Sequence, residues 1–299
     1  MVKLFIIGNG FDISHNLPTR YKDFFQYLLD FQGGINFVEA IEKFSYYNTP
    51  ELWSNFEEHL GYLSADSVID EANHRRIEFN AEFDYETLDD SHITHFLQED
   101  YYSALNNLDD YVKKWAKSVE ILGIERIEKY QNIFDPESIF VTFNYTKVLE
   151  EIYEIEDDRI LHIHGDTDNE PIMGHGRDQI QYTSKSDNRS YDIFEEEFRK
   201  NMFYGFSDFY NSSQKDISLF KIYLRSFISQ YDNDISEIFV IGHSLGRVDS
   251  PYFEFLREHF ENISIKVSYY GKVDYERKEN YLNEFRLDNF ELDNNFLEI

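Results

Sequence analysis

The sequence predicts an α/β fold in which a parallel sheet carries helices on both sides. Short runs rich in Ile, Val and Phe, each ending at a turn or polar signal, indicate five buried strands. Segments with helical spacing of apolar residues lie at Tyr145–Tyr153 and Pro251–Phe260. Strands that alternate with helices in this way are typical of a parallel sheet. The predicted strands are Lys3–Gly8, Ser138–Phe143, Arg159–His164, Glu237–Gly242 and Ile263–Tyr269.

Two long stretches interrupt this alternation. From about Tyr21 to Asn132, apolar residues recur at helical intervals and glycine is scarce, and a second helical stretch covers about 191–231. We therefore expect a single domain over residues 1–299, with helical insertions at about 21–132 and 191–231. The last fourteen residues are acidic, and we expect them to be peripheral.

The charge of the chain limits its partners. Among 299 residues, 58 are acidic and 28 basic, which gives a net charge of −30. Such a field disfavours nucleic acid and anionic membranes, because binding to both depends on Lys and Arg that neutralise phosphate. A small anionic ligand is compatible with this charge, since backbone N–H groups bind phosphate without any net positive charge.

The residue content excludes further classes of site. The chain has no cysteine, so it has no disulfide, thiol chemistry or Cys-ligated metal. The apolar run at its beginning is too short for a signal peptide, and no run approaches the ~18 apolar residues of a membrane span. We expect a cytoplasmic protein with no membrane association.

The first apolar run passes directly into Gly8-Asn9-Gly10, followed by Phe11 and Asp12. A strand that breaks into Gly-x-Gly is typical of a Rossmann-like phosphate-binding turn, because glycine allows a tight turn and leaves room for a pyrophosphate. The third glycine of the full fingerprint would fall at position 13, which is Ile13. The alternative is a simple strand-to-turn junction without a ligand.

Asn144 follows the second predicted strand. In open parallel sheets, ligands bind outside the carboxyl ends of the strands. Asn144 is therefore placed to point its amide into a crevice shared with Gly8 and Gly10. The alternative is that Asn144 only caps a helix that begins at Thr146.

His162 and His164 end the third predicted strand, and the two-residue period of a strand puts them on one face. One interpretation is a metal pair completed by Asp166 or His175. The other is a single general base, His164, with a pKa near the working pH.

Gly242-His243-Ser244-Leu245-Gly246 matches Gly-x-Ser-x-Gly, the nucleophile elbow of α/β-hydrolases. A catalytic triad in that fold needs a histidine after the serine. The only one is His259, which lies on the helix predicted to follow the elbow. The other interpretation is a tight turn that hydrogen-bonds a nucleotide.

These motifs, in this order, resemble the bacteriophage abortive-infection AbiH family, and they span residues 7 to 249. The matching elements are Ile7-Gly8-Asn9-Gly10-Phe11-Asp12, His15, Leu17-Pro18-Thr19, Tyr21, Trp53 with Phe56-Glu57, Phe143-Asn144-Tyr145-Thr146, His162, His164-Gly165, Gly174-His175-Gly176, and Gly242-His243-Ser244-Leu245 with Asp249.

Part of the same pattern is similar, more distantly, to the NAD-binding core of sirtuins and sirtuin-like defence domains. This resemblance implies that the glycine turn receives the pyrophosphate, that Asn144 positions a water at the anomeric carbon, and that His164 acts on a ribose hydroxyl. It implies a catalytic pair, Asn144 and His164. The NAD-binding residues that it implies are Gly8, Asn9, Gly10, Phe11, Asp12, His15, Gly242, His243, Ser244 and Asp249.

The chain departs from sirtuins in three places. It lacks the four-cysteine zinc module, it has Thr146 where sirtuins usually have Asp, and Asp12 and His15 replace small residues in the first loop. We therefore expect hydrolysis of the nicotinamide–ribose bond rather than protein deacylation.

The resemblance thus implies an anti-phage effector with NAD as substrate or ligand, no true cofactor and no metal. We expect a small nucleotide ligand, and a homo-oligomer or a partner protein of a defence system. Two alternatives stay open. One is a metal-dependent hydrolase or nuclease-type toxin that uses His162, His164, His175 and the acidic residues of the first loop. The other is a non-catalytic nucleotide-binding sensor.

Overall fold

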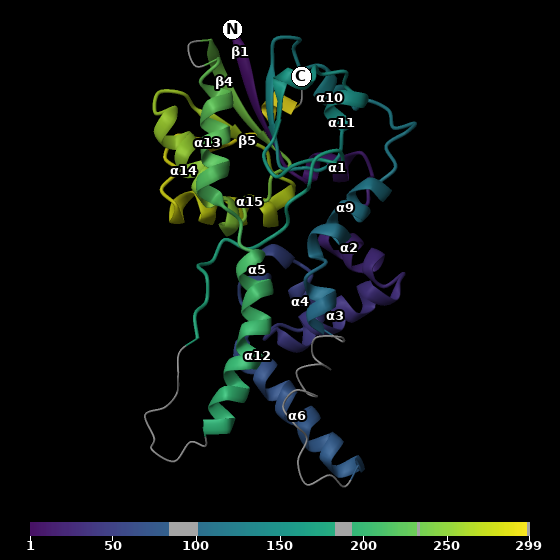
Figure 1. Cartoon of the computed structure of the whole chain (residues 1–299). Coiled ribbons are helices and arrows are strands. Elements are labelled where there is room, and N and C mark those ends of the chain that lie inside the picture. The colour runs from purple at the N-terminus through teal and green to yellow at the C-terminus, as the bar shows by residue number, and fades with distance from the viewer. Residues whose placement is uncertain (84–100, 183–192, 232–233, 298–299) are drawn as a thin grey trace. The chain divides into compact units, whose positions relative to one another are not determined.

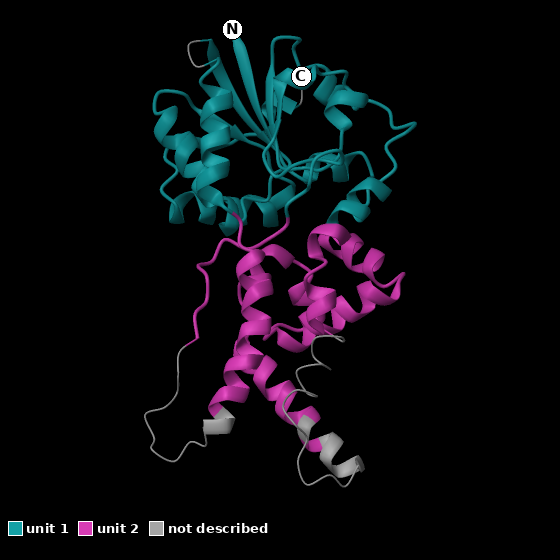
Figure 2. Cartoon of the chain, viewed as in Figure 1, with its two compact units in different colours: residues 1–20, 112–172, 216–299 teal, residues 21–111, 173–215 magenta. Residues whose placement is uncertain are grey.

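The computed structural model describes residues 1–83, 101–182, 193–231 and 234–297 (Figure 1). Contacts within the chain define two compact units (Figure 2). The first consists of residues 1–20, 112–172 and 216–299, and the second of residues 21–111 and 173–215. Among the described residues, no helix has the length and apolar composition needed to cross a bilayer.

The first unit is built on a six-stranded sheet in which every pairing is parallel. The strand order is β3-β2-β1-β4-β5-β6. All five predicted strands are confirmed, with ends shifted by at most two residues. The strands are β1 (Val2–Ile7), β2 (Ile139–Thr142), β3 (Ile160–His162), β4 (Ile235–Ile241), β5 (Ile265–Val267) and β6 (Phe290–Leu292).

The apolar runs are continuous because both faces of the sheet are buried. In β1, Leu4 and Ile6 belong to one core cluster, and Phe5 and Ile7 belong to another. The first cluster is completed by α13 (Ile217–Ile228), α14 (Ser250–His259) and α15 (Gly271–Glu284). The second contains side chains of α1 (Gly10–Ser14), α10 (Glu128–Gln131) and α11 (Val148–Glu151).

The described part of the second unit is helical, as the spacing of apolar residues predicts. Its helices are α2 (Tyr21–Leu28), α3 (Gln32–Phe44), α4 (Thr49–Leu52), α5 (Phe56–Leu60), α6 (Ala65–Phe83), α8 (Ser103–Leu105) and α12 (Ile193–Ser212). Helix α9 (Leu108–Ser118) begins in it, and from Val112 on its residues belong to the first unit. Short 3-10 turns η2 (Asp157–Arg159), η3 (Arg247–Asp249) and η4 (Asn295–Leu297) lie in the first unit.

Two expectations for the first unit are wrong. The acidic end of the chain is not peripheral, because β6 pairs with β5 and the Phe290 and Phe296 side chains are buried in the two core clusters. The helix expected over Tyr145–Tyr153 is reduced to α11, a single turn. Phe253, Leu256 and Phe260 are all buried, so the face predicted for Pro251–Phe260 is confirmed.

The backbones of the turns that follow β1 and β4 are in direct contact. Gly10 N donates to Gly242 O at 2.7 Å, and Gly8 N donates to Ile241 O at 2.9 Å. A Cβ on Gly10 would lie 2.7 Å from Gly242 Cα, and one on Gly242 would lie 2.4 Å from Phe11 N. Gly242 also has a φ of +65°, which side chains disfavour. Because they have no side chain, these glycines allow the two backbones to pack directly against each other.

We predict that Gly242→Ala lowers the free energy of unfolding by about 2–4 kcal/mol, because it adds both strain and overlap. Gly246→Ala in the same loop is the matched control. Gly246 has a φ of −68°, and the atoms nearest to its Cβ position lie 3.8 and 3.9 Å away. Urea denaturation followed by circular dichroism measures both variants. Equal stability of the two would contradict the role given to the glycine contact.

Candidate functional site

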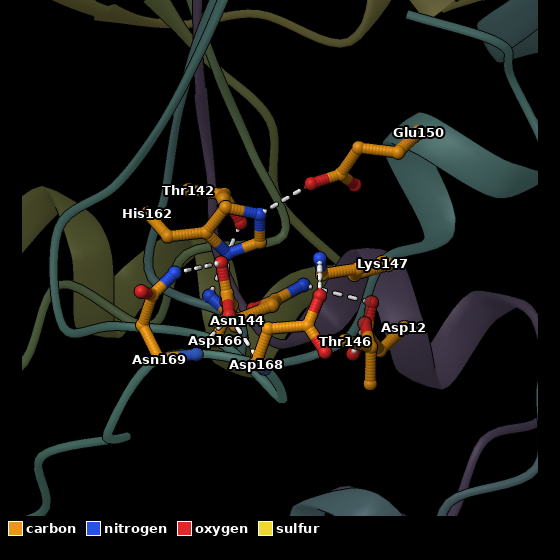
Figure 3. A network of polar contacts seen from close by, with 10 residues as sticks. All are labelled: Asp12, Thr142, Asn144, Thr146, Lys147, Glu150, His162, Asp166, Asp168 and Asn169. Atoms are coloured by element: carbon orange, nitrogen blue, oxygen red, sulfur yellow. Dashed lines mark hydrogen bonds and ion pairs between the residues drawn. The ribbon is translucent and has the colours of Figure 1, made fainter. Parts of the chain in front are cut away.

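A buried polar cluster lies where β1 and β2 end (Figure 3). Asp12, in the first turn of α1, is 1% exposed. Asn144 Nδ2 donates to Asp12 Oδ1 at 2.9 Å, and Thr146 Oγ1 donates to Asp12 Oδ2 at 2.7 Å. Asn144 Nδ2 also lies 3.3 Å from Gly8 O. The structure therefore brings Asn144 next to Gly8, as predicted for the carboxyl ends of adjacent strands, and it adds Asp12 as a partner that the sequence did not predict.

The environment of Asp12 changes its ionisation. Burial raises the pKa of Asp12 from 3.8 to about 7, and the hydrogen bonds from Thr146 and Asn144 only partly oppose this. A carboxyl group with this pKa exchanges its proton near neutral pH. Such a value is common at functional sites and rare at solvated surface positions.

Asn144 does not cap a helix. Helix α11 begins at Val148, its N-cap position is Lys147, and the Asn144 side chain is directed to Asp12 and Gly8 instead. Asn144 Oδ1 is buried and has no hydrogen-bond partner. A buried acceptor without a donor is costly, so this atom has the capacity to receive a hydrogen bond from a water or ligand.

His162 holds the backbone of Asn144. Its Nδ1 donates to Asn144 O at 2.9 Å, and its Nε2 lies 2.7 Å from Glu150 Oε1. Burial alone would lower the pKa of His162, but the bond to Glu150 and the charge of that carboxylate raise it above the ordinary value. Both ring nitrogens face oxygen atoms, of Asn144 and Glu150, and this arrangement favours the protonated ring.

His164 lies apart from this pair, and the prediction that the two histidines share a face is wrong. Strand β3 ends at His162, so the alternation does not continue to His164. His164 is 4% exposed, its Nε2 lies 3.2 Å from the Tyr252 hydroxyl, and its ring contacts Phe143 and Phe220.

The residues proposed as metal ligands have other partners. Asp166 accepts hydrogen bonds from the backbone of Asp168 and Asn169 and from the Asn169 side chain, which fix the turn after β3. His175 belongs to the second unit, where Nε2 donates to Tyr210 O and Nδ1 accepts from Arg177 N. Within the described ranges, no group of three His, Asp or Glu side chains could hold a metal ion.

His175 lies in a buried polar arrangement of the second unit. Glu57 pairs with Lys215, whose side chain is fully buried, and accepts from Gly174 N and the Tyr21 hydroxyl. Lys215 N donates to His175 O. Because these contacts join α5 to the segments around His175 and Lys215, we assign Glu57 a role in stability.

His243 fixes the loop after β4. Its Nδ1 accepts from Leu245 N at 2.9 Å, so Nε2 carries the proton that faces Asp249 Oδ2 at 3.6 Å. The ring packs edge-on against Phe143, with centroids 4.4 Å apart. His243 is thus joined to the neighbour of Asn144, on the side of the chain where His164 also lies.

Ser244 lacks the geometry of a nucleophile elbow. The described backbone places Gly242 and Leu245, not Ser244, at positive φ, and α14 begins only at Ser250. Ser244 is exposed, and its carbonyl accepts from Arg277. His259 lies at the end of α14 and packs against Phe255 and Phe260. A strained strand-to-helix turn, which the elbow requires, is absent at this serine.

The remaining residues of the first loop have internal partners. Asn9 Nδ2 donates to Thr19 O, and Phe11 lies in the core. His15 Nδ1 donates to Phe11 O, and its Nε2 accepts from the Tyr153 hydroxyl. Burial lowers the pKa of His15, so the ring is neutral.

Sequence reasoning missed a pocket beside the polar cluster. It has a volume of about 380 Å³, within the range of small-molecule sites. Its polar wall includes Thr146, the partner of Asp12, and Lys147, which pairs with Asp168. The only signal in the sequence was the position of these residues just after predicted strands. The lining residues are Ala116, Lys117, Val119, Ile121, Thr146, Lys147, Glu151, Thr167 and Asp168.

The parallel sheet and the polar cluster at its carboxyl edge define an α/β protein with a candidate ligand site at the strand ends. The profile of the family described as Bacteriophage abortive infection AbiH matches residues 4–269, so the chain belongs to this family. Membership suggests a role in phage abortive infection. No curated protein and no solved structure matches the chain.

We predict that Asp12 makes stability depend on pH. Below about pH 4 its carboxyl group is protonated in both states, and its stabilising contribution is complete. As the pH rises toward about 7, only the unfolded state releases the proton readily, so the free energy of unfolding falls by up to about 1.4 kcal/mol per pH unit.

Asp12→Asn keeps the size of the side chain and removes this titration. The free energy of unfolding of both chains is measured in urea from pH 4 to 8. We expect the difference between the original chain and Asp12→Asn to change over this range. Two parallel curves would show that Asp12 titrates at its ordinary pKa.

We predict that Ser244 is no nucleophile. Because the side chain is exposed, Ser244→Ala should change the free energy of unfolding by less than about 0.5 kcal/mol. A fluorophosphonate probe should leave the original chain unlabelled by mass spectrometry. Stoichiometric labelling that disappears in Ser244→Ala would restore the hydrolase interpretation.

Proposed function

We propose that this chain is an abortive-infection effector that hydrolyses NAD at the nicotinamide–ribose bond. The water oxygen forms a bond to the anomeric carbon, the carbon–nitrogen bond breaks, and nicotinamide leaves with the bonding pair. The water loses a proton, and ADP-ribose is the second product.

The fold supports a nucleotide as ligand. The strand order β3-β2-β1-β4-β5-β6 is that of doubly wound sheets that bind dinucleotides. In those sheets the order reverses between strands 1 and 4, and the ligand lies outside their carboxyl ends. The turns containing Gly8 and Gly242 follow β1 and β4 at that edge.

The observation that carries the proposal is the unpartnered Oδ1 of Asn144. Asn144 Nδ2 is held by Asp12, so the amide is oriented and Oδ1 is left to accept a hydrogen bond. A water that donates to this atom would be positioned for attack, which is the role that the resemblance to sirtuins implies for Asn144.

His164 is the proposed general base for a ribose hydroxyl. Its bond to the Tyr252 hydroxyl orients the ring. Asn144 and His164 are both buried, at 6% and 4% exposure. We therefore propose that turnover follows an activating step, during infection, that opens this region to NAD.

A non-catalytic nucleotide sensor is the second candidate. It is favoured by the burial of both proposed catalytic side chains, Asn144 and His164, because a sensor needs neither of them to reach a substrate. A sensor would bind a nucleotide and leave NAD intact.

We predict that infected cells carrying the original chain lose NAD before lysis, whereas cells carrying His164→Gln do not. Gln can keep the bond to Tyr252 but cannot act as a base, so the rate should fall about 10²–10⁴-fold. Asn144→Ala should also abolish the loss of NAD, provided that circular dichroism shows it folded. His259→Gln, an exposed histidine on α14, is the matched control.

Nicotinamide and ADP-ribose, measured by liquid chromatography and mass spectrometry, report the reaction directly. Protection from phage with steady NAD would exclude hydrolysis and favour the sensor. Equal loss of NAD with His164→Gln would remove His164 from the mechanism.

A further inference from the structure

The turn that should bind phosphate by sequence pattern has little capacity to do so here. The N–H groups of Gly8 and Gly10 donate to β4 and to the turn after it, and a Cβ at either glycine would meet backbone of Gly242 or His243. The space next to these glycines is therefore filled by protein. A phosphate group needs donors elsewhere.

The pocket beside Thr146 offers such donors. Lys117, Lys147 and Thr167 are among the residues that line it, and their side chains carry two ammonium groups and a hydroxyl. Lysine is a common ligand of phosphate, to which it presents a point charge and several donors. Ala116, Val119 and Ile121 form an apolar wall against which the rest of a small molecule can pack.

In this structure the Lys147 ammonium group is already paired with the Asp168 carboxylate. The two side chains form an ion pair, in which Lys147 is 22% exposed and Asp168 is 73% exposed (Figure 3). The hydrogen bond to Asp168 raises the pKa of Lys147. Because Asp168 lies mostly in water, its carboxylate can leave at little cost, whereas the ammonium is held in the pocket wall.

We propose that this pocket binds a small phosphate-bearing molecule, whose phosphate displaces the Asp168 carboxylate from Lys147. Glu151 is the second acid of the pocket, and with Lys117 and Lys147 present the four charged side chains sum to zero. Displacement of Asp168 leaves the two lysines facing the phosphate. Binding does not depend on NAD hydrolysis, so this proposal and the proposed function can fail separately.

The test is calorimetric titration of the full chain with two phosphate probes, ribose 5-phosphate and AMP. Ribose, adenosine and ribonate, which carries a carboxylate, are the matched ligands without phosphate. Both phosphate probes should bind, and the three others should not. Binding of AMP but not of ribose 5-phosphate identifies a nucleotide as the source of the phosphate, and equal binding identifies a phosphosugar.

Three variants locate the site. Lys147→Met should weaken binding about 10- to 100-fold, because hydrogen bonds to charged groups contribute about 1.5–3 kcal/mol. Asp168→Asn should strengthen it about two- to fivefold, because an exposed ion pair no longer competes. Lys114→Met, an exposed lysine of α9 that does not line the pocket, should leave it unchanged.

The proposal would be overturned by no heat with either phosphate probe, by equal affinity of Lys147→Met, or by weaker binding by Asp168→Asn. Binding of ribonate as tight as that of ribose 5-phosphate would also overturn it, since the site would then recognise negative charge alone.

Discussion

The carboxyl group of Asp12 is the point on which the candidate site depends. A carboxyl group buried without partners would be costly, so the amide of Asn144 and the hydroxyl of Thr146 must face it. This fixes the loop after β2 against the turn after β1. The backbone of Asn144 is then held from the other side by His162, which is paired with Glu150. A titratable group of the first loop thereby sets the orientation of the residue proposed to position water.

Phe143 and Asn144 are adjacent in the chain, and together they connect this cluster to a second group of side chains. Asn144 points to Asp12, whereas the adjacent Phe143 packs against His164 and His243. His243 in turn holds the turn whose Gly242 meets Gly10. The polar cluster around Asn144 and the group of side chains around Phe143 are therefore not independent. A shift of Phe143 would be transmitted to Asn144 through one peptide unit, which gives a physical route by which an event at the loop after β4 could reach the candidate site.

The sequence was sufficient for the five strands and their parallel arrangement, because a sheet buried on both faces requires continuous apolar runs. It did not predict β6 or the burial of Phe290 and Phe296, because the acidic residues around them interrupt the apolar pattern. It placed Asn144 at a strand end but could not show that Asp12, far away in the chain, is its partner. The two histidines were misjudged because alternation holds only within a strand, and β3 ends at His162. The pocket beside Lys147 has no motif, as its walls come from three separate segments.

The pairing of β1 with β4 has a consequence for the synthesis of the protein. Ile7 lies beside Ile241, more than two hundred residues later in the chain. At about 5–20 residues per second, a ribosome needs roughly 10–50 s to make the intervening segment. During that time one side of the central strand has no partner, and the glycine turn has nothing against which to close. A fragment that ends before residue 235 lacks β4 and the Gly242 backbone that the glycine turn contacts. Incomplete translation products of this chain therefore lack one side of the edge at which the candidate site lies.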